Sequence, residues 1–340
     1  MANINNMKIN FEPNTKTLLL IVVVLVVSCT NKPAEKTKIV ETVPEVDHIE
    51  HDLQIIDISQ KQLALYNQHV NTDSVQRVKI FRDSLYYPYQ EIWDNYLGKI
   101  ETFDAVVEHY GIRIIDQLNE KNKLFYSRNK EDALLDAFFK VRDGMIELTG
   151  HSPKGKWYLF YGPSAANLGS VGEDLMFVDF GFPDNNDLPS VINWFPHELN
   201  HLIYSNLNND TARHALEVCI NEGLAVYVNK LYWNTIGGKK DYSVAMSLSY
   251  SEQELAIAEQ EWNFILSYFK ENYLAVDQNV KNNFGSRSSK LKENLPGAIG
   301  YLIGYKIVES YVKINGPDSW KDCYTLGLEE LLEKSEILKE

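Results

Sequence analysis

An HExxH motif, made by His197, Glu198 and His201, constrains this chain more than any other feature. Residues four apart on an α-helix are rotated by only about 40°, so both imidazoles project from one face. Glu222 lies 21 residues after His201, in a second amphipathic run over about residues 211–233. Two imidazoles and one carboxylate are the ligand set of a catalytic zinc ion with a fourth position open for water. Glu198 lies between the histidines, where its carboxylate can reach that water as general base.

The surroundings of the motif strengthen this interpretation, because HExxH alone is short enough to occur by chance. Its neighbours are mostly apolar, as a buried helix requires: Trp194, Phe195, Leu199, Leu202 and Ile203. Glu222 also lies in an apolar run, where a buried carboxylate needs a partner such as a metal ion. The alternative is a buried helix pair whose polar side chains are satisfied by hydrogen bonds.

The chain resembles known zinc peptidases. The HExxH motif, together with Asn221-Glu222-Gly223-Leu224-Ala225, resembles the gluzincins, and the second piece is similar to that of the zinc aminopeptidase branch. A closer resemblance, over roughly residue 154 to the C-terminus, is to a family of predicted zinc-dependent proteases. It rests on both motifs and on three further segments: 158–160, 176–179 and 300–305. The resemblance implies one zinc ion per chain, with His197, His201 and Glu222 as ligands and Glu198 as the base.

Two positions depart from this resemblance. Pro196 directly precedes the first ligand, and helix interiors avoid proline, so we expect a kink or a local restart of the helix. Thermolysin-like members carry an acidic residue four positions after the ligand glutamate, where this chain has Val226. The group that orients a ligand imidazole must therefore come from elsewhere.

The resemblance also implies further residues of the site. The strand shortly before an HExxH helix is the sheet edge that faces the cleft, and a peptide pairs with it through main-chain hydrogen bonds. That strand is expected at residues 175–180, with Met176, Val178 and Asp179 as substrate-binding residues. Gluzincins commonly use a downstream tyrosine or histidine as a second donor to the oxyanion.

Tyr301 is the candidate for that donor. Gly300 and Gly304 on either side of it should let its helix approach another element closely. Tyr305, one turn further on the same face, is the second candidate. The alternative is that both tyrosines only pack in the core.

The patterns predict an α+β fold, mostly helical, with a small antiparallel sheet packed on a zincin-like active-site helix pair. Helices are expected within residues 73–148, where Asp73 caps the first and its apolar face carries Val75, Phe81 and Leu85. Strands are expected at 157–161 and 175–180, joined by a mobile loop.

Further helices are expected after the HExxH region. Ser251 and Glu254 form a capping box that should begin a long helix to about Tyr273. Residues 276–293 are polar and indicate a loop or lid. The last helices are expected at 296–314 and 326–338.

Residues 1–28 are typical of a signal peptide. An apolar run of ten residues, Leu18 to Val27, follows basic residues and is too short to span a bilayer. The Ser28-Cys29 junction resembles a bacterial lipoprotein box, which implies cleavage after Ser28 and a lipid on Cys29. A plain signal peptide or an uncleaved anchor is the alternative.

The remaining chain divides into a flexible tether at 29–46, a helical region at 47–150 and a zincin-like catalytic region at 151–340. The formal net charge of −14 excludes a basic footprint for nucleic acid. The expected partners are a peptide or protein substrate and, through Cys29, a membrane. The expected location is the cell envelope of a Gram-negative bacterium, on the periplasmic face of the outer membrane.

These lines together predict a membrane-tethered zinc-dependent peptidase that hydrolyses peptide bonds with a zinc-activated water. One alternative is a catalytically inactive zincin-fold lipoprotein that serves the envelope as a scaffold or binding module. Another is a zinc hydrolase of non-peptide amides, which fold and metal do not distinguish from a peptidase. Glu198 favours catalysis, because inactive relatives commonly lose the base.

Overall fold

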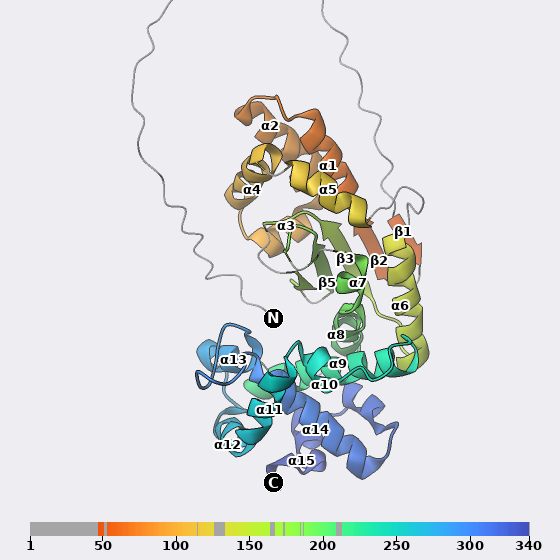
Figure 1. The fold of residues 1–340 in the computed structure, drawn as a ribbon, viewed down its shortest axis with the longest axis vertical. Coiled ribbons are helices and arrows are strands. Elements are labelled where there is room, and N and C mark those ends of the chain that lie inside the picture. Colours follow the sequence, from red (N-terminus) through yellow and green to blue (C-terminus); the bar gives the residue numbers. More distant parts are fainter. Residues whose placement is uncertain are drawn as a thin grey trace, which may run out of the picture.

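A central sheet lies between the helices of residues 59–125 on one side and the helices from residue 133 onward on the other (Figure 1). The computed structural model describes residues 47–50, 53–113, 115–125, 133–163, 167–172, 174–183, 185, 187–208 and 213–339. The predicted signal peptide, Cys29 and the tether lie outside these residues. The described chain is mostly helical with one small sheet, which confirms the α+β prediction.

The sheet is mixed. Within the described chain its order is β1-β2-β3-β5-β4, with strands at Asp47–Glu50 (β1), Leu53–Asp57 (β2), Gly155–Phe160 (β3), Leu168–Ser170 (β4) and Leu175–Asp179 (β5). β2, β3 and β5 are parallel, whereas β1 and β4 run antiparallel to their neighbours. The prediction of an antiparallel sheet is therefore wrong. The long helical segment between β2 and β3 provides the crossover that a parallel pair needs, and it joins strands from both sides of residue 150.

That crossover contains the N-terminal helices: α1 (Ser59–Gln68), α2 (Ser74–Phe81), a π-helical turn (Arg82–Tyr86), a 3-10 turn (Tyr87–Tyr89), α3 (Gln90–Leu97), α4 (Ile100–Arg113), α5 (Ile115–Phe125) and α6 (Ala133–Thr149). Asp73 caps α2, as predicted, by accepting a hydrogen bond of 3.0 Å from the Gln76 amide. Phe81 and Leu85 are buried, but Val75, predicted on the same apolar face, is 81% exposed.

Both faces of the sheet are covered, because successive side chains of β3 point to opposite sides. Trp157 packs edge-on against Phe138 of α6, with ring centroids 4.7 Å apart. Phe160 points the other way and packs against Trp93 of α3 at 4.8 Å. Central strands buried on both faces are the expected result of helices on both sides of a parallel sheet.

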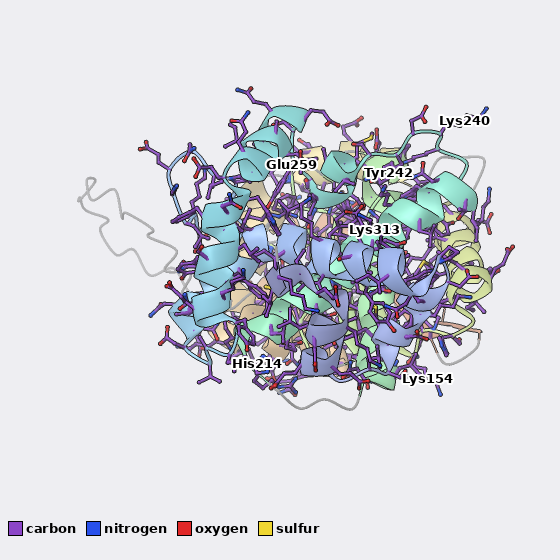
Figure 2. All side chains as sticks on the ribbon, turned by 90° about the horizontal axis from the view of Figure 1, so that it is seen from below. Lys154, His214, Lys240, Tyr242, Glu259 and Lys313 are labelled. Carbon is purple, nitrogen blue, oxygen red and sulfur yellow. The ribbon has the colours of Figure 1, made fainter. Side chains whose placement is uncertain are left out.

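The C-terminal half is helical: α7 (Leu188–Ile192), α8 (Phe195–Leu207), α9 (Ala215–Thr235), α10 (Val244–Leu248), α11 (Glu252–Gln260), α12 (Trp262–Asn272), α13 (Gln278–Gly285), α14 (Ile299–Asn315), a 3-10 turn (Ser319–Tyr324), α15 (Leu328–Ser335) and a last turn (Ile337–Lys339). Figure 2, seen from this end, shows α14 crossing the face, with Lys313 exposed on it. Among the described helices, none combines the length and the hydropathy of a transmembrane segment.

Three details refine the predictions for this half. The Ser251–Glu254 capping box is confirmed, but the helix it begins ends at Gln260 and a new one starts at Trp262. The predicted loop or lid at 276–293 contains a helix, α13. Pro196 lies in the first turn of α8, where a missing amide hydrogen costs nothing, so the predicted local restart is confirmed.

Candidate metal centre

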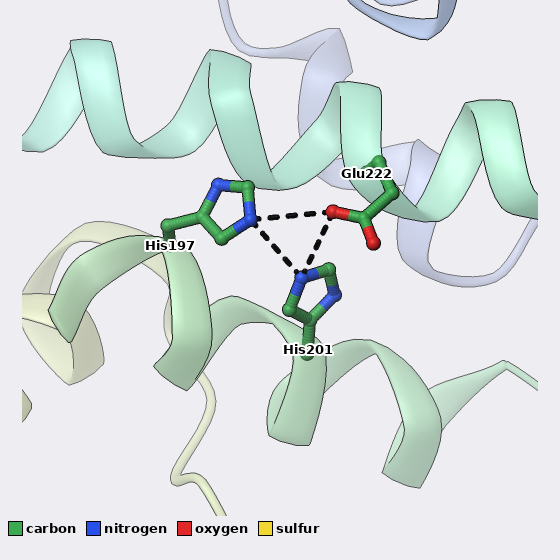
Figure 3. Close-up of side chains that lie close together, drawn as sticks. All are labelled: His197, His201 and Glu222. Carbon is green, nitrogen blue, oxygen red and sulfur yellow. Dashed lines mark hydrogen bonds and ion pairs between the residues drawn. The ribbon is translucent and has the colours of Figure 1, made fainter. Parts of the chain in front are cut away.

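Two helices bring three potential metal ligands together. His197 and His201 project from α8 toward Glu222 of α9 (Figure 3). The two Nε2 atoms are 3.2 Å apart, and each lies 3.3 Å from Oε2 of Glu222. Within the described chain this is the only cluster of three or more histidine, cysteine, aspartate or glutamate residues with metal-binding geometry.

The triangle has the size that zinc requires. Zinc bonds nitrogen and oxygen ligands at about 2.0–2.1 Å, and tetrahedral angles then separate the ligand atoms by about 3.3 Å. The side chains of His201 and Glu222 are 13% and 12% exposed, while Oε2 of Glu222 itself is buried, and three donors leave one position of a tetrahedral ion unfilled. The donor set therefore fits a zinc ion with one position open to water or substrate.

The charges within the cluster are coupled. Burial raises the pKa of Glu222, but the two histidines outweigh burial and hold this pKa well below its usual value. Burial lowers the pKa of His201, but the charge and hydrogen bond of Glu222 raise it to about 9. Without a metal ion, the site at neutral pH is thus an imidazolium beside a carboxylate.

Asn221 orients one of the imidazoles. Its Oδ1 lies 2.8 Å from Nδ1 of His201, and because an amide oxygen only accepts, Nδ1 donates and Nε2 is left free to bind a metal. Burial raises the pKa of the Glu217 carboxyl, one turn earlier, and the Asn221 side chain lowers it. Asn221 thus orients the imidazole of His201, a role that the apolar side chain of Val226 does not provide. Nδ1 of His197 is buried and has no hydrogen-bond partner among the described residues.

Glu198 faces the sheet edge beside the cluster. A Cβ atom placed on Gly169 of β4 would lie 3.9 Å from Oε2 of Glu198. Burial, together with the charge of Glu222, raises the pKa of Glu198, whereas His197 and His201 lower it. A carboxyl whose pKa is raised toward neutrality is suited to accept a proton and then return it.

The comparison with known proteins agrees with this site. The model of the family described as Predicted Zn-dependent protease (DUF2268) matches residues 164–333, half of the chain. The chain belongs to this family. No curated protein and no solved structure matches the chain significantly. The segment shared with the predicted Zn-dependent proteases runs from just before β4 into α15 and so contains all three potential ligands and Glu198.

In this member of the family, glycines bring a third helix against the site. A Cβ atom on Gly304 of α14 would lie 1.7 Å from the carbonyl oxygen of Cys219 on α9. A Cβ atom on Gly223 would lie 2.0 Å from the carbonyl carbon of Gly304. The two backbones are therefore in direct contact, and the close approach predicted for Gly300 and Gly304 is confirmed. Cys219 is buried in this contact and is not bonded to another cysteine.

This crossing places Tyr301 beside the cluster. Its ring stacks on the ring of His197, with centroids 6.0 Å apart and planes 8° from parallel. Burial and the charge of Glu222 raise the pKa of Tyr301 well above its usual value. Tyr305 lies elsewhere, because its hydroxyl accepts from Lys230 at 3.0 Å and donates to Glu309 at 2.8 Å. The structure therefore brings Tyr301, and not Tyr305, to the ligands.

The predicted substrate-binding strand lies inside the sheet and not at its edge. β5 pairs with β3 on one side and β4 on the other, so it is not the sheet edge. Met176 and Val178 are fully buried, and Asp179 is occupied by Tyr96 and by the amides of Gly162 and Gly181. The prediction of an edge at 175–180 is wrong, because the loop that follows β3 contributes its own short strand, β4, outside β5.

Proposed function

We propose that this protein is a zinc-dependent peptidase that cleaves a peptide bond with a water molecule at the His197–His201–Glu222 centre. The observation that supports this most directly is the triangle of ligand atoms at 3.2–3.3 Å with Glu198 beside it. A bound zinc ion would supply a Lewis acid that lowers the pKa of water and polarises the scissile carbonyl.

The residues of the chain perform the proton transfers in this proposal. Glu198 takes a proton from the attacking water and passes it to the leaving amine. Its raised pKa keeps the protonated form accessible during the reaction. Asn221 holds His201 in the tautomer that presents Nε2 to the centre. Tyr301 stays protonated over the neutral pH range and donates a hydrogen bond to the developing oxyanion.

The free edge of β4 is the proposed binding strand for the peptide. The Asp179 amide bonds to the carbonyl of Asn167, and the Val171 amide bonds to that of Leu175. Because pairing groups alternate along an antiparallel strand, the main-chain groups of Ser170 point away from β5. No other strand of the described chain pairs with this edge. An extended substrate can therefore add to the sheet beside Glu198.

The membrane tether is a separate part of the proposal. Cleavage after Ser28 and a lipid on Cys29 would hold the enzyme on the periplasmic face of the outer membrane. Metabolic labelling with a fatty acid tests this step, and a Cys29→Ala chain that is labelled and membrane-bound like the wild type contradicts it.

Two substitutions test the peptidase. Glu198→Gln should retain one zinc ion per chain and the fold while kcat falls about 10²–10⁴-fold, because only the base is lost. His201→Ala should lose the zinc ion itself, measured by elemental analysis. Wild-type hydrolysis by Glu198→Gln, or full zinc occupancy in His201→Ala, contradicts the proposal.

A further inference from the structure

An arginine lies at the margin of the metal centre. Arg287, in the segment after α13, is exposed, and its guanidinium carbon lies 4.7 Å from the ring centroid of Tyr301 and 5.6 Å from that of Tyr250. Tyr301 in turn stacks on His197 at 6.0 Å. The two distances of 4.7 and 6.0 Å limit the separation of the guanidinium from the His197 ring to at most 10.7 Å.

The backbone around Arg287 holds this cation in place. The Ala298 amide donates to the carbonyl of Ser286 at 2.8 Å, which ties the segment to the start of α14. A Cβ atom on Gly297 would lie 2.0 Å from the carbonyl oxygen of Arg287. The Tyr250 hydroxyl donates to the Gly297 carbonyl at 2.8 Å, which fixes the ring that flanks the guanidinium. The backbone of Arg287 and one of the two rings beside its guanidinium are therefore fixed by the fold.

Among the residues that the structure describes, Arg287 forms no ion pair. No carboxylate of the described chain lies within 4.0 Å of its guanidinium, although the whole sequence has 47 acidic residues against 33 Lys and Arg. The planar guanidinium presents donors that match the two oxygens of a carboxylate. The tyrosine rings stabilise its charge without using those donors.

We propose that Arg287 binds a carboxylate of the peptide substrate, which makes it a specificity-determining residue; this inference rests on the proposed peptidase function. An extended peptide advances about 3.3–3.6 Å per residue, so the carboxylate lies within about three residues of the scissile bond. It is either the C-terminal carboxylate or an acidic side chain. Both sources present the same group to the guanidinium.

Matched peptides separate the two sources. The full chain, loaded with zinc, is given two pairs of N-acetylated hexapeptide libraries. The first pair differs only at the C-terminus, which is a free carboxylate or a carboxamide. The second pair is amidated at the C-terminus and contains either glutamate or glutamine. We expect kcat/KM to favour one acidic library over its neutral counterpart by about 10- to 100-fold, mainly through KM. Arg287→Met should bring that ratio close to one, and Arg287→Lys should recover part of it because the charge remains. Lys290→Met removes a charge three residues away and should keep the ratio.

A binding measurement makes the test independent of turnover. The Glu198→Gln chain is titrated with the same libraries and monitored by saturation-transfer NMR, where acidic peptides should bind more tightly and Arg287→Met should remove the difference. Equal binding and equal hydrolysis of acidic and neutral peptides overturn the inference and leave the peptidase intact. A fall in kcat for all libraries in Arg287→Met, with the ratio unchanged, also overturns it, since Arg287 then only positions Tyr301. If no library is hydrolysed, the proposed function fails, and the titration still decides whether Arg287 binds a carboxylate.

Discussion

The metal centre lies between two interfaces that are packed in different ways. On one side, α8 meets α6 and the sheet through large rings: Phe138, Trp157 and Phe195 have centroids 4.6–5.3 Å apart. On the other side, α9 meets α14 through bare backbone at Gly223 and Gly304. The first interface is packed by large side chains, whereas the second is a contact between backbones at residues that have no side chain.

This difference has consequences for the site. A truncated ring leaves a cavity, and the surrounding core relaxes only partly, so stability is lost while the backbone of α8 keeps its place. A side chain added to the glycine crossing has no space, so one helix must move. Because Glu222 and Tyr301 lie on opposite sides of that crossing, the movement changes the site itself.

Gly304→Leu should have the largest effect. The new side chain meets the Cys219 carbonyl, and we expect the free energy of unfolding to fall by more than about 5 kcal/mol, together with zinc binding. Denaturant unfolding and elemental analysis measure both. Gly327→Leu is the control, because its Cβ meets nothing within 4 Å and its φ of −62° is ordinary, so it should cost at most about 1 kcal/mol. Equal stability of the two variants would show that the crossing is loose.

Phe138→Ala tests the aromatic interface. Deleting this buried ring should reduce the free energy of unfolding by about 3–5 kcal/mol. The contact between Trp157 and Phe195 remains and keeps α8 against the sheet, so the folded fraction should bind zinc with nearly wild-type affinity. Loss of zinc binding in folded Phe138→Ala would show that the aromatic interface also controls the geometry of the site, as the glycine crossing does.

Asn221→Ala should act on the ligand orientation alone. Without its oxygen, His201 loses the bond that selects its tautomer, and zinc affinity should fall about 10–100-fold. Competition with a chromogenic chelator measures this change. Glu217→Gln keeps a polar group next to Asn221, so its zinc affinity should fall by less than that of Asn221→Ala. An unchanged affinity in Asn221→Ala would show that Nε2 of His201 needs no orienting partner.

Counted per pH unit, the smallest effect is the pH dependence of zinc binding. His201 has its pKa raised from 6.5 to about 9 in the metal-free protein, so its contribution to metal-free stability is full below 6.5 and is lost as pH rises through 9. Zinc needs the neutral imidazole, so its affinity should change in the opposite sense and rise up to about tenfold per pH unit toward pH 9. Calorimetry in buffers of different ionisation enthalpy should detect about one proton released per zinc at pH 7. Binding that is constant from pH 7 to 9 contradicts this linkage.

Much of the centre could be predicted from local patterns. The spacing of His197 and His201 places both imidazoles on one helical face whatever the surroundings are, and the apolar run around Glu222 required a partner for its carboxylate. The glycines beside Tyr301 indicated a close helix contact, although not which helix would be met. The capping box at Ser251 predicted where a helix begins, but the break at Glu261 depends on packing outside that motif.

The sheet edge could not be predicted in this way. β4 is three residues long, has Gly169 as its middle residue and is followed by Gly172, so its local pattern is that of a loop. It becomes a strand only because β5 offers unpaired main-chain groups on its outer side. Arg287 is likewise distant in sequence from His197, and only the folded segment at the start of α14 brings its charge to the centre.

By itself, the sequence determined that His197 and His201 share one helical face with Glu198 between them, because helical periodicity relates residues a few positions apart through geometry that needs no other part of the chain. It offered Glu222 as a third potential ligand only through the apolar surroundings of that carboxylate. Only the tertiary structure decided that Asn221 bonds His201, that β4 and not β5 is the edge, and that Tyr301 rather than Tyr305 faces the ligands. These features depend on where separate helices and strands come to rest against one another, and that is set by packing between residues far apart in the sequence.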